Sequence, residues 1–333
     1  MIGKDKREIL KVSDLVTEFN LPEGRIRAVN HLNFCINSGE TLGLVGESGC
    51  GKSVTALSIL RLVPDPPGKI VEGKILFNDQ DLLKLPLSKM RKIRGSQIAM
   101  VFQEPMTALN PLFTVGNQIS EVYIEHLKHQ SREAWERSVE MLKKVGIPSP
   151  AQRAHEYIHQ ISGGMRQRAM IAMALACNPR LILADEPTTA LDVTIQSQIL
   201  ELMKDLQARS GMAILLITHN LGVVAEVCDR VIVMYLGQAV EEADGDALFD
   251  NPLHPYTRGL IGSVPFPGRK SLKGKQKLIE IPGMVPSMFD LPKGCVFHPR
   301  CSEAEDLCKQ EIPAWIEVGK GHHVACWGVQ FLK

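Results

Sequence analysis

Residues 46–53 read Gly46-Glu-Ser-Gly-Cys-Gly-Lys52-Ser53 and fit the pattern G-x-x-x-x-G-K-[ST]. An apolar stretch, Thr41 to Val45, precedes this segment, and a helical pattern from Lys52 to Leu62 follows it. Strand, loop and helix in this order are the context in which the pattern binds phosphate. The glycines allow the backbone to turn so that successive N–H groups point inward at phosphate oxygens. The segment therefore predicts a phosphate-binding loop.

Two side chains of this loop have expected roles. Lys52 places a cation near the β- and γ-phosphates of a nucleotide, and the Ser53 hydroxyl suits magnesium. The start of the following helix adds a partial positive charge. The loop residues predicted to bind ATP are Gly46, Glu47, Ser48, Gly49, Cys50, Gly51, Lys52, Ser53 and Val54. Because Cys50 lies inside the loop, we also expect the activity to be sensitive to thiol reagents.

A second apolar stretch, Leu181 to Ala184, predicts a short strand that is buried on both faces. Asp185 and Glu186 follow at its carboxyl end, where ligands of open α/β sheets bind. Asp185 is expected to hold magnesium through a water. Glu186 is expected to polarise a water molecule in line with the γ-phosphate. Combined with a phosphate loop, this acidic pair predicts ATP hydrolysis.

The segment Ser162-Gly-Gly-Met165-Arg-Gln-Arg168 resembles the signature motif of ATP-binding cassette (ABC) ATPases. Other family motifs resemble segments of this chain: Gln103 the Q-loop glutamine, Thr189 to Asp192 the D-loop, His219 the switch histidine, and Phe19 the aromatic that stacks on adenine. The commonest signature is Leu-Ser-Gly-Gly-Gln, whereas this chain has Ile161 and Met165. The serine and glycines that touch phosphate are intact, so activity is expected without a glutamine contact.

The resemblance covers residues 8 to 265 and implies an α/β fold of the phosphate-loop ABC type. It implies a RecA-like core, an antiparallel β layer and a helical subdomain at about residues 104–178. It also implies a head-to-tail dimer, in which the signature of one chain closes over the γ-phosphate held by the other. The roles that it implies are catalytic for Glu186, His219 and Gln103, magnesium-binding for Ser53, Gln103 and Asp185, and signature contacts in trans for Ser162, Gly163, Gly164 and Met165.

The C-terminal part has a different character. Asn251 to Leu260 resembles a stretch of ATPases from the dipeptide and oligopeptide importer branch, although no residue there has an evident chemical task. Beyond it, prolines and a basic run from Arg269 to Lys277 predict a solvated linker. We therefore expect a nucleotide-binding domain over residues 1–265 and a small Cys-rich extension over residues 266–333.

Four of the eight cysteines lie in the last forty residues, separated by five, six and seventeen residues: Cys295, Cys301, Cys308 and Cys326. The importer branch has a similar tail. A cytosolic location argues against two disulfides, and the clustering argues against unrelated buried thiols, so we expect a metal site. We favour a [4Fe-4S] cluster, because the C-x2-C pairs usual in zinc modules are missing. Its expected role is to cross-link and stabilise the extension. Zinc, and free thiols or disulfides, are the alternatives.

Composition sets further limits. The 333 residues carry a formal net charge of +1 and are 44% apolar, which suits one large α/β domain with a smaller appendage. This charge does not favour a nucleic-acid partner. The longest apolar stretches are too short to span a bilayer, and the charged opening lacks a signal-peptide core.

The resemblance implies the ATP-hydrolysing subunit of a dipeptide or oligopeptide importer at the cytoplasmic face of the cell membrane. Its implied cofactors are ATP, Mg²⁺ and the [4Fe-4S] cluster. Its implied partners are two membrane permeases, a second copy or a sister ATPase, and indirectly an external peptide-binding protein. The alternatives are a soluble ABC ATPase that acts on nucleic acid, or a redox or metal sensor. The neutral charge and the single cassette argue against the nucleic-acid alternative.

Overall fold

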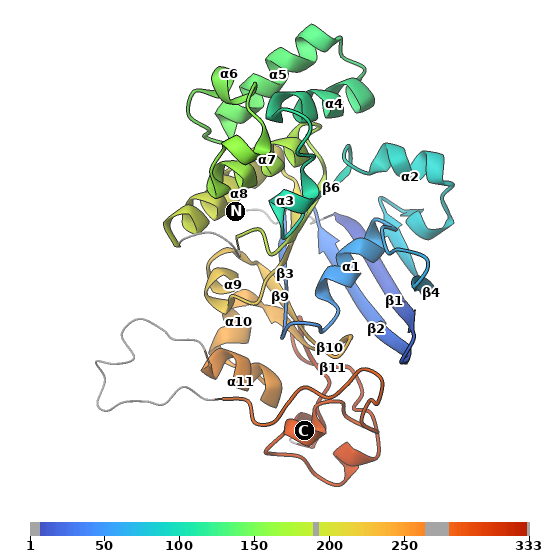
Figure 1. Ribbon diagram of the computed structural model, residues 1–333. Coiled ribbons are helices and arrows are strands. Elements are labelled where there is room, and N and C mark those ends of the chain that lie inside the picture. The colour runs from blue at the N-terminus through green and yellow to red at the C-terminus, as the bar shows by residue number, and fades with distance from the viewer. Residues whose placement is uncertain (1–6, 189–192, 264–279, 332–333) are drawn as a thin grey trace, which may run out of the picture. The chain divides into compact units, whose positions relative to one another are not determined.

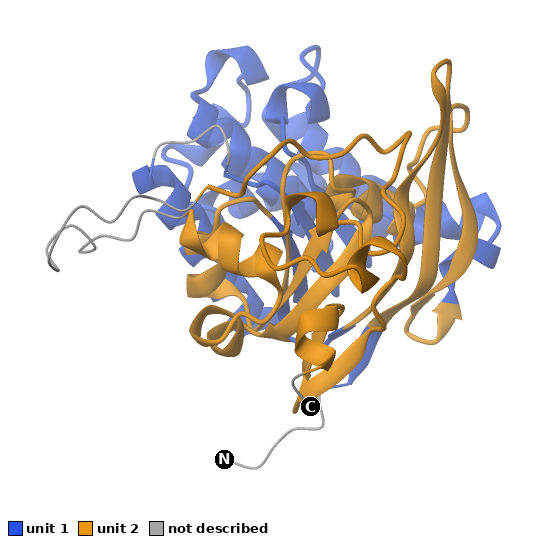
Figure 2. Ribbon diagram, turned by 90° about the horizontal axis from the view of Figure 1, so that it is seen from below, with its two compact units in different colours: residues 1–9, 36–41, 81–217 blue, residues 10–35, 42–80, 218–333 orange. Residues whose placement is uncertain are grey.

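The computed structural model describes residues 7–188, 193–263 and 280–331. The chain divides into two compact units, and each is built from separate stretches of sequence (Figure 2). The first unit comprises residues 1–9, 36–41 and 81–217, and the second comprises residues 10–35, 42–80 and 218–333. The expected D-loop, Thr189 to Asp192, and the basic run from Arg269 to Lys277 lie outside the described residues.

Three parallel strands form the sheet of the first unit. They are β6 (Ile98–Val101), β7 (Leu181–Asp185) and β8 (Ala213–Ile217). Leu181 of β7 pairs with Ile98 on one side and with Ala213 on the other. Every residue of β7 and β8 is buried, as expected for parallel strands with no polar face. The carboxyl end of β7 therefore delivers Asp185 and Glu186 from a rigid core.

Helices make up most of the rest of the first unit. They are α2 (Leu87–Ile93), α3 (Pro105–Ala108), α4 (Val115–Leu127), α5 (Ser131–Lys144), α6 (Pro150–Arg153), α7 (Gly163–Leu175) and α8 (Val193–Ser210), with 3-10 turns at Leu82–Lys84 and Ile158–Gln160. Helices α4, α5 and α7 pack against one another and appear in green in Figure 1. They lie in the stretch for which the sequence predicts a helical subdomain.

The second unit contains an antiparallel layer. Its strands are β1 (Glu8–Leu21), β2 (Gly24–Asn37), β4 (Gly68–Phe77) and β5 (Gln80–Asp81), in the order β2-β1-β4-β5. Strand β1 runs antiparallel to β4, and a bulge interrupts their register between Ser13 and Val16. Strands β1 and β2 are drawn in blue in Figure 1, and β4 in light blue.

A second sheet of this unit carries the phosphate loop. Strand β3 (Thr41–Val45) pairs in parallel with β9 (Arg230–Tyr235), and β9 pairs antiparallel with β10 (Gln238–Asp244). Two short strands near the C-terminus, β12 (His322–Val324) and β11 (Ile316–Gly319), continue this sheet beyond β10. The C-terminal residues are thus hydrogen-bonded to the same sheet as the strand that precedes the phosphate loop.

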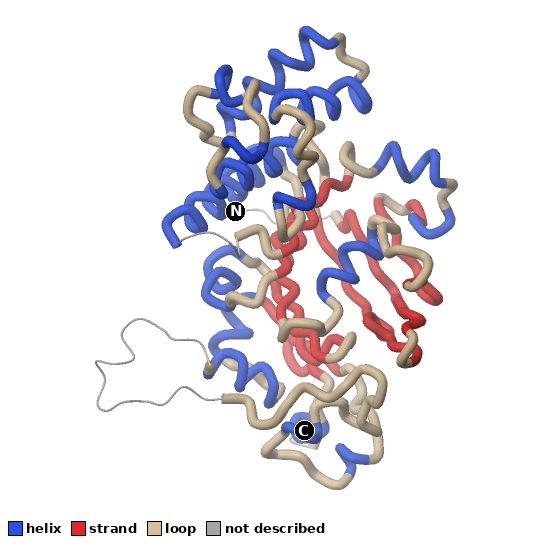
Figure 3. Tube along the Cα trace, in the orientation of Figure 1, coloured by secondary structure: helices blue, strands red, loops and turns tan. Residues whose placement is uncertain are grey.

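The helices of the second unit are α1 (Lys52–Ile59), α9 (Leu221–Val227), α10 (Gly245–Asp250), α11 (Pro255–Gly262) and α12 (Trp327–Gln330). From residue 280 to β11 the chain is mostly loop, with 3-10 turns at His298–Arg300 and Leu307–Lys309 (Figure 3). One buried core joins Val45, Tyr235, Tyr256 and Phe297. Within the described residues, every helix is too short or too polar to cross a membrane.

Candidate nucleotide site and cysteine-rich extension

The phosphate loop follows β3 and ends where α1 begins at Lys52. Two of its glycines have backbone angles that only glycine adopts readily, with φ of 150° at Gly46 and 100° at Gly51. A Cβ at Gly46 would lie 2.3 Å from the Met234 carbonyl oxygen, and one at Gly51 would lie 2.1 Å from that of Ala28. Neighbouring backbone carbonyl groups therefore leave no room for a side chain at either glycine of the predicted turn.

Lys52 is directed into the loop. Its side chain is buried, and Nζ donates hydrogen bonds to the carbonyl oxygens of Gly46 at 2.8 Å and Glu47 at 3.0 Å. These contacts hold the ammonium group among the backbone groups of the loop. Ser53 is half-buried in the first turn of α1. The cation and the hydroxyl assigned from sequence thus lie side by side at the helix start, where anions are favoured.

Cys50 is only 4% exposed, and its burial raises the pKa of its thiol, although Lys52 partly opposes this shift. A buried thiol with a raised pKa reacts slowly. This environment argues against the thiol sensitivity that we expected from sequence. We expect Cys50 to remain unmodified when iodoacetamide-treated native protein is mapped by mass spectrometry, and to be modified after unfolding in denaturant. Rapid labelling of Cys50 in the native protein would contradict this expectation.

The acidic pair at the end of β7 contacts the glutamine that follows β6. Gln103 Nε2 donates a hydrogen bond to Glu186 Oε2 at 3.1 Å, so the structure brings these two predicted catalytic residues together. The Glu186 N–H donates to the Ile217 carbonyl oxygen at 2.8 Å, and its φ is 44°. Asp185, the last residue of β7, is 5% exposed. This arrangement presents two carboxylates and an amide at one edge of the sheet.

The signature segment begins helix α7. Ser162 is its N-cap, and the Ser162 hydroxyl accepts a hydrogen bond from the Met165 N–H at 3.4 Å. Ser162 and Gly163 are exposed, and a Cβ added at Gly163 would meet nothing within 4 Å. The helix start is therefore open to a ligand, as the resemblance requires.

Two further predicted residues lie in the second unit with the phosphate loop. His219 is exposed between Thr218 and Asn220, and the Asn220 side chain caps α9. Phe19 lies on β1, where it is half-buried and packs closely against Gly68.

The four C-terminal thiols lie close to one another. Burial, with smaller contributions from the neighbouring Cys308, Cys326 and Cys301, raises the pKa of Cys295 to about 11. Burial likewise raises the pKa values of Cys301 and Cys326, with added contributions from the neighbouring thiols. The Cys295 N–H also donates to the Cys308 carbonyl oxygen at 2.8 Å. The four cysteines, successive members of which are separated by up to seventeen residues in the sequence, thus lie near one another in the fold.

Sequence reasoning missed the role of the segment from Asn251 to Leu260. His254 is buried and caps α11, with its Nδ1 accepting from the Tyr256 N–H at 3.0 Å. Burial, with a smaller contribution from the charge of Arg258, lowers the pKa of His254 to about 3, which favours the neutral ring. The Tyr256 hydroxyl accepts a hydrogen bond from the Glu47 N–H at 2.9 Å. The prolines of this segment predict a turn before a helix, and they do not indicate a contact with the phosphate loop.

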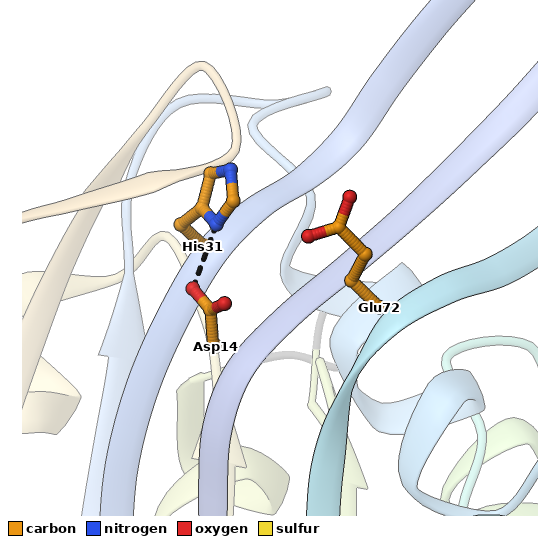
Figure 4. Close-up of side chains that lie close together, drawn as sticks. All are labelled: Asp14, His31 and Glu72. Atoms are coloured by element: carbon orange, nitrogen blue, oxygen red, sulfur yellow. Dashed lines mark hydrogen bonds and ion pairs between the residues drawn. The ribbon is translucent and has the colours of Figure 1, made fainter.

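A cluster that the sequence did not indicate lies on the antiparallel layer. His31 Nδ1 and Asp14 Oδ1 are 2.7 Å apart, and Glu72 faces them from β4 (Figure 4). All three residues are exposed, and Asp14 and His31 both have left-handed backbone angles. The Asp14 N–H also donates to Asn33 Oδ1 at 2.8 Å. These contacts tie β1 to β2 beside the bulge.

The fold and these motifs define an ABC-type ATPase cassette. Residues 29–189 match the family described as ABC transporter. The structure is similar to the dimeric ATP-binding cassette MJ0796 bound to ADP and Pi, with a TM-score of 0.64 and 30% identity, over 71% of this chain and 98% of that one. It is also similar to cbiO1 of Clostridium perfringens, with a TM-score of 0.62 and 28% identity, over 74% and 92% of the two chains.

The particular family follows from the rest of the chain. Residues 240–308 match the family described as oligopeptide/dipeptide transporter, C-terminal region. A probable peptide ABC transporter ATP-binding protein of Sinorhizobium fredii is 54% identical over 96% of this chain and 94% of its own length. AppD, an oligopeptide transport ATP-binding protein of Bacillus subtilis, is 52% identical over 96% of both chains. The chain belongs to the family of ATP-binding subunits of peptide ABC transporters, and it is an ATPase.

Proposed function

We propose that this ATPase energises the import of dipeptides or oligopeptides across the cytoplasmic membrane. The observation that carries the proposal is the similarity to peptide transport subunits over nearly the whole chain, including the peptide-transporter C-terminal region at residues 240–308. The relatives include the dipeptide transport protein DppD of Bacillus subtilis, which is 48% identical over 96% of this chain and 94% of its own length. These similarities favour import over the nucleic-acid and sensor alternatives.

The proposed chemistry assigns one task to each motif. Lys52 binds the phosphates, with Phe19 against the adenine, and Ser53, Gln103 and Asp185 serve the Mg²⁺ ion. Glu186 polarises the attacking water, and His219 contacts the γ-phosphate. The hydrogen bond between Gln103 and Glu186 supports a shared role for these two residues. Lys52, held among loop carbonyls, supports the phosphate role.

We further propose that the chain works as a head-to-tail dimer, with a second copy or a sister ATPase. Ser162, Gly163, Gly164 and Met165 of one chain would then contact the nucleotide of its partner. The exposed start of α7 and the similarity to a dimeric cassette support this proposal. The dimer would lie at the cytoplasmic face of the membrane, beneath two permease subunits that receive peptides from an external binding protein.

A groove in the helical part of the first unit is the proposed permease contact. It has a volume of about 470 Å³, and its lining includes Phe113, Val122 and Met173. Phe113 is 52% exposed and the neighbouring Leu112 is 79% exposed. The buried Gln118 side chain fixes the shape of this loop, because its Nε2 donates to the Asn110 and Phe113 carbonyl oxygens. Glu121, Glu125 and His126 also line the groove, so it offers a helix of a partner apolar contacts flanked by polar and charged side chains.

Replacing Phe113 by Asp should reduce copurification with the permease subunits about tenfold or more, because a charge cannot fill an apolar contact. Phosphate release by the isolated ATPase should remain close to the wild-type rate. Val71→Asp, which changes a 37% exposed side chain on β4, is the matched control and should copurify normally. Equal loss of permease in both variants would argue against this groove.

The four C-terminal cysteines are proposed to hold a [4Fe-4S] cluster through Cys295, Cys301, Cys308 and Cys326. The mutual effects of these thiols on their pKa values support a common ligand set. A [4Fe-4S] cluster bound by these four thiolates would cross-link the segment from Cys295 to Cys326, and a zinc ion is the alternative.

The import function can be tested with the complete transporter in proteoliposomes. ATP on the side of the ATPase should drive uptake of labelled dipeptides or oligopeptides when the external binding protein is present. A Lys52→Ala complex should assemble but not transport, because phosphate binding is lost. Normal ATP hydrolysis without peptide uptake, combined with failure to copurify any permease, would overturn the proposal.

A further inference from the structure

The phosphate loop of this chain contains a carboxylate, Glu47, directly after its first glycine. A negative charge in a loop that binds a triphosphate repels the ligand, and the repulsion is stronger where water is partly excluded. Glu47 is half-buried, with 28% of its side chain exposed. The loop therefore requires something that neutralises this carboxylate.

Arg300 supplies the opposite charge from the C-terminal extension. Its Nη1 donates to Glu47 Oε2 at 2.6 Å and its Nη2 donates to Glu47 Oε1 at 3.1 Å. These two hydrogen bonds form a bidentate ion pair. Its Nε donates to the Pro282 carbonyl oxygen at 3.0 Å, and Nη1 lies 3.4 Å from the Tyr235 hydroxyl. The Arg300 side chain is only 4% exposed. Planar pairs of this kind are strong and fix direction as well as charge.

The backbone of Glu47 is held from the same side. Its N–H donates to the hydroxyl of Tyr256, a fully buried residue of α11. The Tyr256 ring packs against Tyr235 and Phe297, with centroids 4.7 and 5.3 Å apart. Phe297 and Arg300 belong to the segment that runs from Cys295 to Cys301. Residues of the C-terminal part of the chain therefore form hydrogen bonds with both the side chain and the main chain of Glu47.

We propose that Arg300 is a positioning residue for ATP binding, acting through Glu47, and that Tyr256 assists it. Arg300 neutralises the carboxylate and holds the phosphate loop in its binding shape. The C-terminal extension thereby sets the affinity of the enzyme for ATP. The proposal rests on the ATPase activity of the chain, and it assumes no particular transported substrate and no particular metal in the extension.

The test compares full-length variants by binding of a fluorescent ATP analogue with Mg²⁺ and by steady-state ATP hydrolysis. Arg300→Ala should raise the Kd and the KM for ATP about tenfold, as expected for loss of a charge-assisted pair, with kcat at saturating ATP little changed. Arg258→Ala is the matched control, because Arg258 pairs with Glu303 and, among the described residues, has no hydrogen bond or ion pair with the loop. This control should bind ATP as the wild type does.

The double variant separates neutralisation from folding. If Arg300 acts through Glu47, Glu47→Gln should remove most of the affinity loss caused by Arg300→Ala. An Arg300→Ala effect of the same size in both backgrounds would overturn the proposal, as would an Arg300→Ala variant that binds ATP like Arg258→Ala. Should Arg300→Ala not fold, Arg300→Lys provides the comparison. The lysine keeps the positive charge but cannot form the bidentate pair with Glu47. An unchanged KM together with an unchanged kcat in Arg300→Lys would contradict a positioning role.

Discussion

Replacement of Glu186 by Gln is expected to lower kcat for ATP hydrolysis about 10²- to 10⁴-fold while ATP still binds. Glutamine has nearly the same shape, but it cannot polarise the attacking water as a carboxylate does. The site should tolerate the change, because the Glu186 backbone is held by the Ile217 carbonyl oxygen at 2.8 Å. Gln103 would face an amide in place of a carboxylate. The loss should therefore fall on the chemical step rather than on nucleotide affinity.

Phosphate release and nucleotide binding, measured on the same preparation, separate these two effects. Size-exclusion chromatography adds a third readout, because a variant that binds ATP without hydrolysing it should accumulate as a dimer. Glu201→Gln, which changes an exposed carboxylate on α8, is the matched control and should hydrolyse ATP normally. A Glu186→Gln variant with a wild-type rate would show that another group activates the water.

The local parts of the nucleotide site could be predicted from sequence because neighbouring residues determine them. The apolar stretch from Thr41 to Val45 forms β3, and the segment from Leu181 forms β7, which extends to Asp185. The signature segment, which begins at Ser162, forms the start of α7 (Gly163–Leu175). In each case strand or helix periodicity and a specific end residue lie within a few positions of one another.

Contacts between distant parts of the chain could not be predicted in this way. Arg300 and Glu47 are 253 positions apart, and nothing in either segment indicates the other. Tyr256 lies in a stretch in which the sequence indicates no chemical task, yet its hydroxyl accepts a hydrogen bond from the phosphate loop. The burial of Cys50, which argues against the reactivity expected from sequence, likewise depends on surrounding elements that are distant in the chain. Such features depend on packing, which one-dimensional patterns do not encode.

Replacement of Cys308 by Ser is expected to remove the proposed metal cluster and lower the Tm by roughly 5–10 °C. Cys308 is 8% exposed, and its carbonyl oxygen accepts a hydrogen bond from the Cys295 N–H. This region has little regular structure of its own, and cross-linking through four thiolates would contribute much of its stability. Iron and acid-labile sulfide analysis with a visible absorption spectrum, on anaerobically purified protein, measures the loss.

The control is Cys177→Ser, which changes a half-buried thiol outside the extension. It should retain iron, sulfide and Tm. Zinc without sulfide in the wild-type protein would overturn the cluster assignment, and an equal metal content in Cys308→Ser would remove Cys308 from the ligand set. Since Arg300 lies between Cys295 and Cys301, loss of order in this segment should also weaken its pair with Glu47. A raised KM for ATP in Cys308→Ser, absent from Cys177→Ser, would link the stability of the extension to the phosphate loop.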